Sequence, residues 1–87
     1  MSEPEVIRMG CVIQQYLERN NIMEARPKEL MKPLIRAGFF VRDYRDGLPL
    51  RKVLRRLQRE KKLYLIPQVF PEVKDKNTWW YFRPTKF

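Results

Sequence analysis

Apolar side chains recur at helical spacing in three stretches of the chain. In the first stretch, Ser2 and Glu5 fit a capping box, and Pro4 fits the first helical turn. The apolar face that follows consists of Val6, Met9, Gly10, Ile13, Tyr16 and Leu17. Asn20-Asn21 then interrupts the pattern. We therefore predict a helix over residues 3–20.

A second amphipathic stretch begins at Pro27. One face carries Leu30, Met31, Leu34, Ala37 and Gly38. Pro33 lies inside this stretch, where its ring would collide with the carbonyl group four residues earlier. We predict a helix over residues 27–38 that kinks near residue 33 or starts late, with Gly38 just past its C-terminal cap. The short connection at residues 22–26 could form a strand.

Residues 39–47 do not show a helical or strand period. We expect Phe39, Phe40 and Val41 to anchor this stretch in the core. The charged residues that follow are typical of a surface loop, which ends in the turn signal Asp46-Gly47.

The third amphipathic stretch starts at Pro49 and predicts a helix over residues 49–62. Its apolar side chains lie within about 100° of arc, which is a width suited to packing on a core. They are Leu50, Val53, Leu54 and Leu57. The opposite side is almost entirely cationic and carries Arg51, Lys52, Arg55, Arg56, Arg59 and Lys62. Glu60 lies at the flank, four residues after Arg56, where an ion pair can form.

The C-terminal part of the chain is rich in strand-forming residues on either side of a polar turn at residues 74–77. We predict a β-hairpin over residues 63–84, with Pro67 and Pro71 on an open edge or at bulges. In the second strand Trp80 shares a face with Thr78 and Phe82, and Trp79 shares the other face with Tyr81 and Arg83. Both faces carry aromatic rings, so we expect at least one ring to face solvent or a partner.

Composition limits the remaining choices. The 87 residues are enough for one domain, and 44% apolar and 13% aromatic residues favour a packed one. We therefore predict an α+β domain with three helices and a C-terminal two-stranded hairpin. The net charge of +9 favours a polyanionic partner, with nucleic acid first and an anionic membrane second.

Catalysis, metals and cofactors are not expected. The chain has no histidine and a single cysteine, Cys11, so it cannot form an intramolecular disulfide or a zinc finger. It has no glycine-rich phosphate loop, no base for the cysteine and no separated pair of acids. No apolar run reaches the length of a membrane span, and the N-terminus is acidic, unlike a signal peptide. We expect a cytoplasmic location, or a nucleoid or nuclear one, and no secretion.

The order of the predicted elements resembles a winged helix-turn-helix domain from about residue 3 to residue 84. Pro27-Lys28-Glu29-Leu30 is similar to the entry of the second helix of this family, and residues 50–57 are similar to its recognition helix. Residues 63–82 are similar to the wing. The link from Gly38 to Leu48 is longer than the turn of 3–4 residues in a standard helix-turn-helix, which affects how the two helices cross.

The resemblance implies a DNA-binding module, such as a small transcription-regulator-like protein, with residues 49–62 in the major groove of duplex DNA. Arg51, Lys52 and Arg55 would then lie toward the bases, whereas Arg56, Arg59 and Lys62 would meet phosphates. Lys74 and Lys76 at the hairpin tip would reach the minor groove or the backbone. Neutralising about six phosphates would give a slope of roughly −5 for log affinity against log salt.

Two other functions remain open. A winged-helix fold also serves in assembly, so the basic helix could bind an acidic protein partner, and the chain could form a homodimer. Trp79 and Tyr81 could stack on unpaired bases of single-stranded DNA or RNA, or they could serve core packing or a protein interface. Membrane binding is not expected, because the basic helix has its apolar stripe committed to the core and carries no tryptophan.

Overall fold

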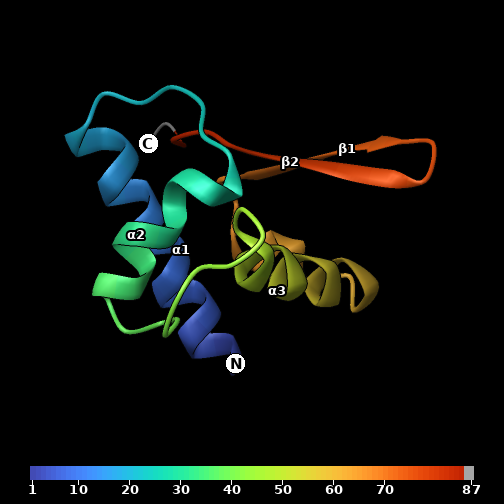
Figure 1. Ribbon diagram of the computed structural model, residues 1–87, viewed down its shortest axis with the longest axis horizontal. Helices are drawn as coiled ribbons and strands as arrows, with labels where there is room; N and C mark the ends of the chain where they lie inside the picture. The colour runs from blue at the N-terminus through green and yellow to red at the C-terminus, as the bar shows by residue number, and fades with distance from the viewer. Residues whose placement is uncertain (86–87) are drawn as a thin grey trace.

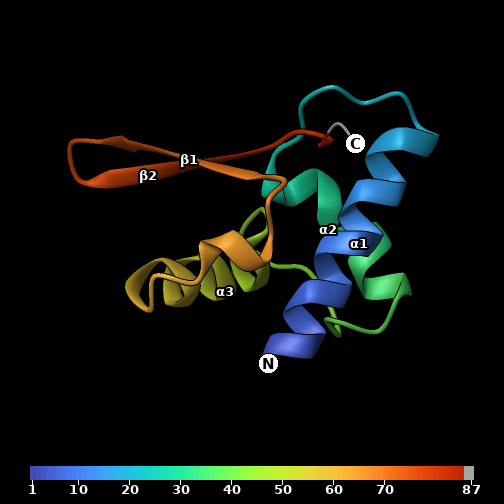
Figure 2. The same cartoon turned by 180° about the vertical axis from the view of Figure 1, so that it is seen from behind.

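Three helices precede a two-stranded antiparallel hairpin in the computed structural model, which describes residues 1–85. The elements are α1 (Glu3–Arg19), α2 (Pro27–Arg36), α3 (Leu48–Arg59), a 3₁₀ turn η1 (Leu63–Leu65), β1 (Val69–Lys74) and β2 (Asn77–Phe82). The fold is therefore α+β, as predicted. α1 and α2 lie side by side, whereas α3 and the hairpin extend together to the other side (Figure 1). The view from behind shows the same arrangement (Figure 2).

The helix ends follow local sequence signals. The predicted capping box is present at α1, where the Ser2 hydroxyl accepts from the Glu5 N–H at 3.4 Å. Past α2, Gly38 has a φ of 87°, its N–H donates to the Ile35 carbonyl, and the next N–H donates to the Leu34 carbonyl. This pattern is a Schellman motif and confirms the role predicted for Gly38. α2 starts at Pro27 and continues through Pro33, so the alternative of a late start is wrong.

α3 is shorter than predicted at its C-terminus. It ends at Arg59, and Lys61 takes a left-handed φ of 59°, which lets the Lys62 N–H donate to the Leu57 carbonyl at 2.8 Å. The chain then turns back so that Leu63 and Leu65 pack against the core. Because this packing ends the helix, Lys62 does not lie on the basic face to which its spacing assigned it.

The hairpin begins later than predicted. Leu63–Leu65 forms the 3₁₀ turn rather than a strand, and the first strand starts at Val69, opposite Phe82. The predicted strand at residues 22–26 is reduced to one antiparallel bridge, in which Ala25 and Phe82 exchange two backbone hydrogen bonds of 2.9 Å. This bridge places the end of β2 between Ala25 and β1.

The core lies where the three helices meet one face of the hairpin. Its most buried large side chains are Met9, Ile13, Leu17, Leu30, Met31, Leu34, Leu50, Leu54, Leu57, Ile66, Trp80 and Phe82. Phe39 and Phe40 pack against this core as expected, but Val41 is 94% exposed, so its predicted anchoring role is wrong. The chain has already turned into the surface loop there, and no element covers that side chain.

One buried polar side chain joins α1 to the C-terminal segment. The carbonyl oxygen of Gln14 accepts hydrogen bonds from the backbone N–H of Thr85 at 2.9 Å and from the Gln68 side chain at 3.2 Å. Its amide group donates to the Thr85 carbonyl oxygen at 3.1 Å. These bonds fix both ends of the hairpin region to α1.

Candidate functional site

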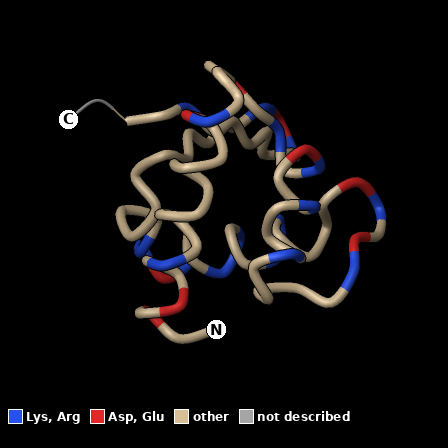
Figure 3. The backbone as a smooth tube through the Cα atoms, turned by 90° about the vertical axis from the view of Figure 1, so that its left-hand side faces the viewer, with Lys and Arg blue, Asp and Glu red and all other residues tan. Residues whose placement is uncertain are grey.

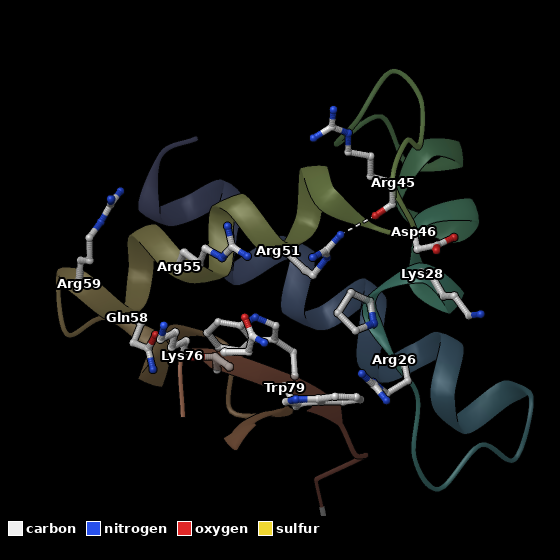
Figure 4. A pocket seen from close by; sticks show the side chains of 14 residues that line it. Arg26, Lys28, Arg45, Asp46, Arg51, Arg55, Gln58, Arg59, Lys76 and Trp79 are labelled. Carbon is white, nitrogen blue, oxygen red and sulfur yellow. Dashed lines mark hydrogen bonds between the residues drawn. The ribbon is translucent and has the colours of Figure 1, made fainter. Parts of the chain in front are cut away.

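A groove of about 900 Å³ lies between α3 and the hairpin, and the start of α2 and the loop before α3 close one end of it (Figure 4). We call it the basic groove. Its cationic side chains are Arg26, Lys28, Arg45, Arg51, Arg55, Arg59 and Lys76. The other lining residues are Pro27, Asp46, Gln58, Asn77, Thr78, Trp79 and Trp80.

One face of α3 forms the first wall of the groove. Arg51, Arg55 and Arg59 follow each other at intervals of four residues, and Gln58 lies beside them. Residues at this spacing lie above one another on a helix. The buried Leu50, Leu54 and Leu57 hold the adjacent face of α3 on the core, so the arginines are presented from a fixed element.

The end of the groove that α2 and the loop before α3 close depends on a close contact between two backbone segments. Gly47, the N-terminal cap of α3, has a φ of 86° and lies directly against the first turn of α2. A Cβ atom on Gly47 would lie 2.7 Å from the backbone nitrogen of Lys28. This approach brings Arg45 and Lys28 to the same end of the groove, and Arg51 donates to the Arg45 carbonyl oxygen there (Figure 4).

The open edge of β2 forms the opposite wall. Phe82 turns both backbone hydrogen-bonding groups away from β1, toward Ala25. Since these groups alternate along an antiparallel strand, those of Trp80 and Thr78 face the same open edge, where no backbone group within residues 1–85 pairs with them. Pro71, which lacks an N–H, lies opposite Trp80 and leaves the ladder intact, as predicted for an edge position.

The electrostatics of the groove are one-sided. Seven cations line it against the single carboxylate of Asp46, and none of the seven makes a salt bridge within the described part of the chain. Like charges held together on a fixed surface repel one another and attract a polyanion. The acidic residues Glu3 and Glu5 lie instead at the start of α1, near the N-terminus (Figure 3).

The cations predicted for the site therefore separate into two groups. Arg51, Arg55, Arg59 and Lys76 line the groove, and Lys52, Arg56, Lys62 and Lys74 do not. Arg56 donates to the carbonyl oxygen of Met1 at 2.9 Å, and Lys62 pairs with Glu3 at 2.9 Å. The hydrogen bond to the Glu3 carboxylate raises the pKa of Lys62. These two side chains contact residues at the N-terminus.

The other two cations contact aromatic or acidic neighbours. The Lys52 ammonium lies 5.7 Å from the centre of the Tyr44 ring, and Lys74 pairs with Glu72 at 3.3 Å. Lys74 also lies 5.5 Å from the centre of the Trp79 ring, on the hairpin beside the groove. Neither lysine reaches the groove lining.

Trp79 and Tyr81 lie on the hairpin face opposite the core. The guanidinium carbon of Arg26 lies 4.8 Å from the ring centre of Trp79 and 4.9 Å from that of Tyr81, so one arginine contacts both rings. Trp79 lines the groove and is 41% exposed, whereas Tyr81 is partly buried beside Arg26 and is not a lining residue. The predicted exposed aromatic ring is therefore present.

Three groove cations were not identified from the sequence: Arg26, Lys28 and Arg45. Arg26 and Lys28 flank the proline that begins α2, and Arg45 precedes the turn signal Asp46-Gly47. Each lies at the boundary of an element, where basic residues commonly approach a ligand through a helix start or loop. Their positions beside predicted starts were the available signal. The contact at Gly47 brings Arg26 and Lys28 near α3, and the hydrogen bond from Arg51 holds the Arg45 backbone beside α3.

No group of three or more histidine, cysteine or acidic side chains within residues 1–85 is arranged to hold a metal ion. Among the helices of the same residues, none combines the length and the apolar character needed to cross a bilayer. No protein-family model, curated protein or solved structure matches the chain.

Proposed function

We propose that this chain is a winged-helix-like module that binds duplex DNA, with α3 in the major groove and the hairpin beside it. The observation that carries the proposal is the basic groove, in which seven cations without ion-pair partners in residues 1–85 face one carboxylate. The order of helices and strands supports it. So does the Ala25 bridge, which adds a third strand position beside β2, as in the sheet of that fold.

The arginines of α3 suit both tasks of a DNA contact. A guanidinium group can donate two parallel hydrogen bonds to a guanine edge or to a phosphate, and a glutamine amide can pair with adenine. Arg55 and Gln58 lie on the α3 wall with these groups available. The few guanidinium and amide side chains of α3 therefore make the contacts to base edges. Arg59 lies further along α3, where it can contact a phosphate.

Phosphate binding falls to the rim of the groove. Lys28 and Arg45 at one end and Lys76 on the hairpin can neutralise phosphates, and the edge N–H group of Thr78 can donate to a phosphate oxygen. An acceptor-rich ligand such as a nucleic-acid backbone complements such a surface.

The open edge of β2 favours one alternative, an acidic protein partner. An acidic peptide could pair with the edge backbone of Thr78 while its carboxylates meet the arginines of α3. The two partners differ in what they require. DNA binding needs the arginine face of α3 in register with the phosphates, and it responds steeply to salt.

The test compares two neighbouring arginines on α3. Arg55→Ala removes a groove cation and Arg56→Ala removes a cation bound to Met1, so both variants lower the net charge equally. We expect Arg55→Ala to weaken binding to a mixed-sequence duplex about 5-fold or more, and to reduce the salt slope by about 1 if Arg55 contacts a phosphate. Arg56→Ala should change the affinity by less than about 3-fold, since it alters only long-range attraction.

Fluorescence anisotropy with a labelled duplex across a salt series measures both quantities. Thermal melts of the two variants check that each remains folded. Equal losses for Arg55→Ala and Arg56→Ala would show that net charge alone attracts the DNA, and the groove would not be the site. Absence of salt-dependent binding by the unaltered chain at low ionic strength would refute DNA binding altogether.

A further inference from the structure

Trp79 is an exposed aromatic side chain in a groove otherwise dominated by cations. It is 41% exposed, whereas the adjacent Trp80 is 1% exposed within the core. Trp79 lies outside the core and does not pack against it as a partly buried neighbour. Core packing therefore does not explain this side chain, and leaving an indole ring in water forgoes the free energy that its burial would provide.

The ring is held in place before any ligand binds. The Arg26 guanidinium contacts Trp79 and Tyr81 together, and Lys74 also lies over the Trp79 ring at 5.5 Å. Figure 4 shows Trp79 along the hairpin side of the groove, with Arg26 beside it. A ring fixed in this way loses little conformational freedom when a second flat group stacks on it. The cations around it would meet the phosphates that flank such a group.

The chemistry of the neighbourhood selects the stacking group. An aromatic ring surrounded by cations binds a flat group that belongs to a polyanion, which describes a nucleotide base. A base inside a duplex has both of its faces covered by neighbouring base pairs. Only an unpaired base, such as one in a strand that continues beyond the duplex, leaves a face open to stack on a side chain.

We infer that Trp79 is a stacking site for an unpaired base next to the duplex bound by α3. The preferred ligand of the groove is then duplex DNA with a short single-stranded extension, rather than a blunt duplex. This inference rests on the proposed duplex-binding function, and it adds a specificity that the arginines of α3 do not provide. Trp79 and the α3 arginines line one groove, so one strand can contact both.

Phe70 provides a matched control. It is 45% exposed and lies on the same hairpin face as Trp79, because it is paired with Tyr81 across the strands. It does not line the basic groove. Phe70→Ala therefore removes an exposed ring of the same hairpin face without altering the proposed stacking site, and Trp79→Ala removes the site itself.

The experiment measures affinity for four labelled ligands with matched sequences: a blunt duplex, the same duplex extended on one strand, the same duplex extended on the other strand, and the extension alone. We expect the unaltered chain to bind one extended duplex about 5-fold or more tighter than the blunt duplex. Trp79→Ala should remove this preference, so that it binds the extended and the blunt duplex with equal affinity. Phe70→Ala should retain the preference. Thermal melts show that the variants are folded.

Tryptophan fluorescence provides a second readout that does not depend on Trp79→Ala folding. Stacking of a base on the exposed indole should quench part of the emission when the extended duplex is added. In Trp79→Phe the remaining tryptophan is the buried Trp80, so the additional quenching by the extended duplex over the blunt one should disappear. The phenyl ring introduced in that variant retains an aromatic face, so part of the preference in affinity should persist.

The failures of the two proposals are distinguishable. Equal binding of blunt and extended duplexes by the unaltered chain, or retention of the preference in folded Trp79→Ala, overturns the stacking site and leaves duplex binding intact. Failure to bind any duplex at low salt overturns the proposed function and the stacking site together. Quenching of Trp79 by an acidic peptide but by none of the DNA ligands also overturns the stacking site, in favour of a protein contact at Trp79.

Discussion

Replacing Gly47 with alanine tests how the loop between α2 and α3 forms the basic groove. Gly47 combines a left-handed φ of 86° with a close approach to another backbone. An alanine Cβ would lie 2.7 Å from the Lys28 nitrogen and 2.8 Å from the Pro27 carbonyl carbon. Both atoms belong to the first turn of α2, so they cannot rotate away as a side chain would. α2 and α3 must separate to accept the methyl group.

Gly38 allows the two costs to be separated. It has nearly the same φ, 87°, but a Cβ there would have no atom within 4 Å. Gly38→Ala should therefore lower the free energy of unfolding only by the cost of the left-handed conformation, about 1 kcal/mol. Gly47→Ala adds a steric conflict worth about 1 to 3 kcal/mol, which gives a total of roughly 2 to 4 kcal/mol.

Denaturant unfolding followed by tryptophan fluorescence measures both free energies. We further expect Gly47→Ala to weaken duplex binding under conditions where it is folded, because Lys28 would move away from α3. Gly38→Ala should leave binding unchanged. Equal destabilisation by the two substitutions would refute this reasoning. It would mean that the loop yields without cost and that the contact at Gly47 does not fix the position of α3.

Two further predictions concern the hydrogen bonds of α1, at its start and with the C-terminal segment. Glu5→Gln keeps an oxygen acceptor but removes the charge, and hydrogen bonds from the backbone and hydroxyl of Ser2 lower the pKa of Glu5 below its usual 4.5. A lowered carboxylate pKa stabilises the fold above 4.5 and ceases to do so as the pH falls through the lowered value. The melting temperature of Glu5→Gln should thus be below that of the unaltered chain at about pH 7, and the gap should close below pH 4.5, as followed by circular dichroism. A gap independent of pH would contradict this. Gln14→Ala leaves the Thr85 and Gln68 donors without their acceptor and should cost about 1 to 3 kcal/mol in denaturant unfolding. Exposed Gln15→Ala is its control and should stay within about 0.5 kcal/mol, whereas equal effects would show that the buried bonds add no stability.

Local signals predicted the helices well because their causes are local. A capping box needs only Ser2 and Glu5, and a Schellman motif is marked by a residue such as Gly38 that tolerates a left-handed φ. The end of α3 was misplaced because Lys61 takes that conformation without being glycine. Leu63 and Leu65 pack on the core, and this tertiary contact sets the C-terminal end of α3.

The same distinction applies to the site. Helical spacing determined that Arg51, Arg55 and Arg59 share one face of α3, because angles within a helix follow from residue number alone. Spacing could not show that Arg56 and the nearby Lys62 are held by the N-terminal residues. Those contacts join residues more than fifty positions apart, and they exist only once α1 packs against the 3₁₀ turn that follows α3.

The sequence by itself determined the number and order of the helices, the presence of a hairpin, the apolar face of each helix and the excess of positive charge. Tertiary structure decided which charges face one another. It brought Arg26 and Lys28 near α3 through the close approach at Gly47, and it placed the open edge of β2 opposite the arginines of α3. The spacing of residues in the sequence determines the directions of the side chains within one helix or strand. The distance between two such elements depends on how both pack on a shared core.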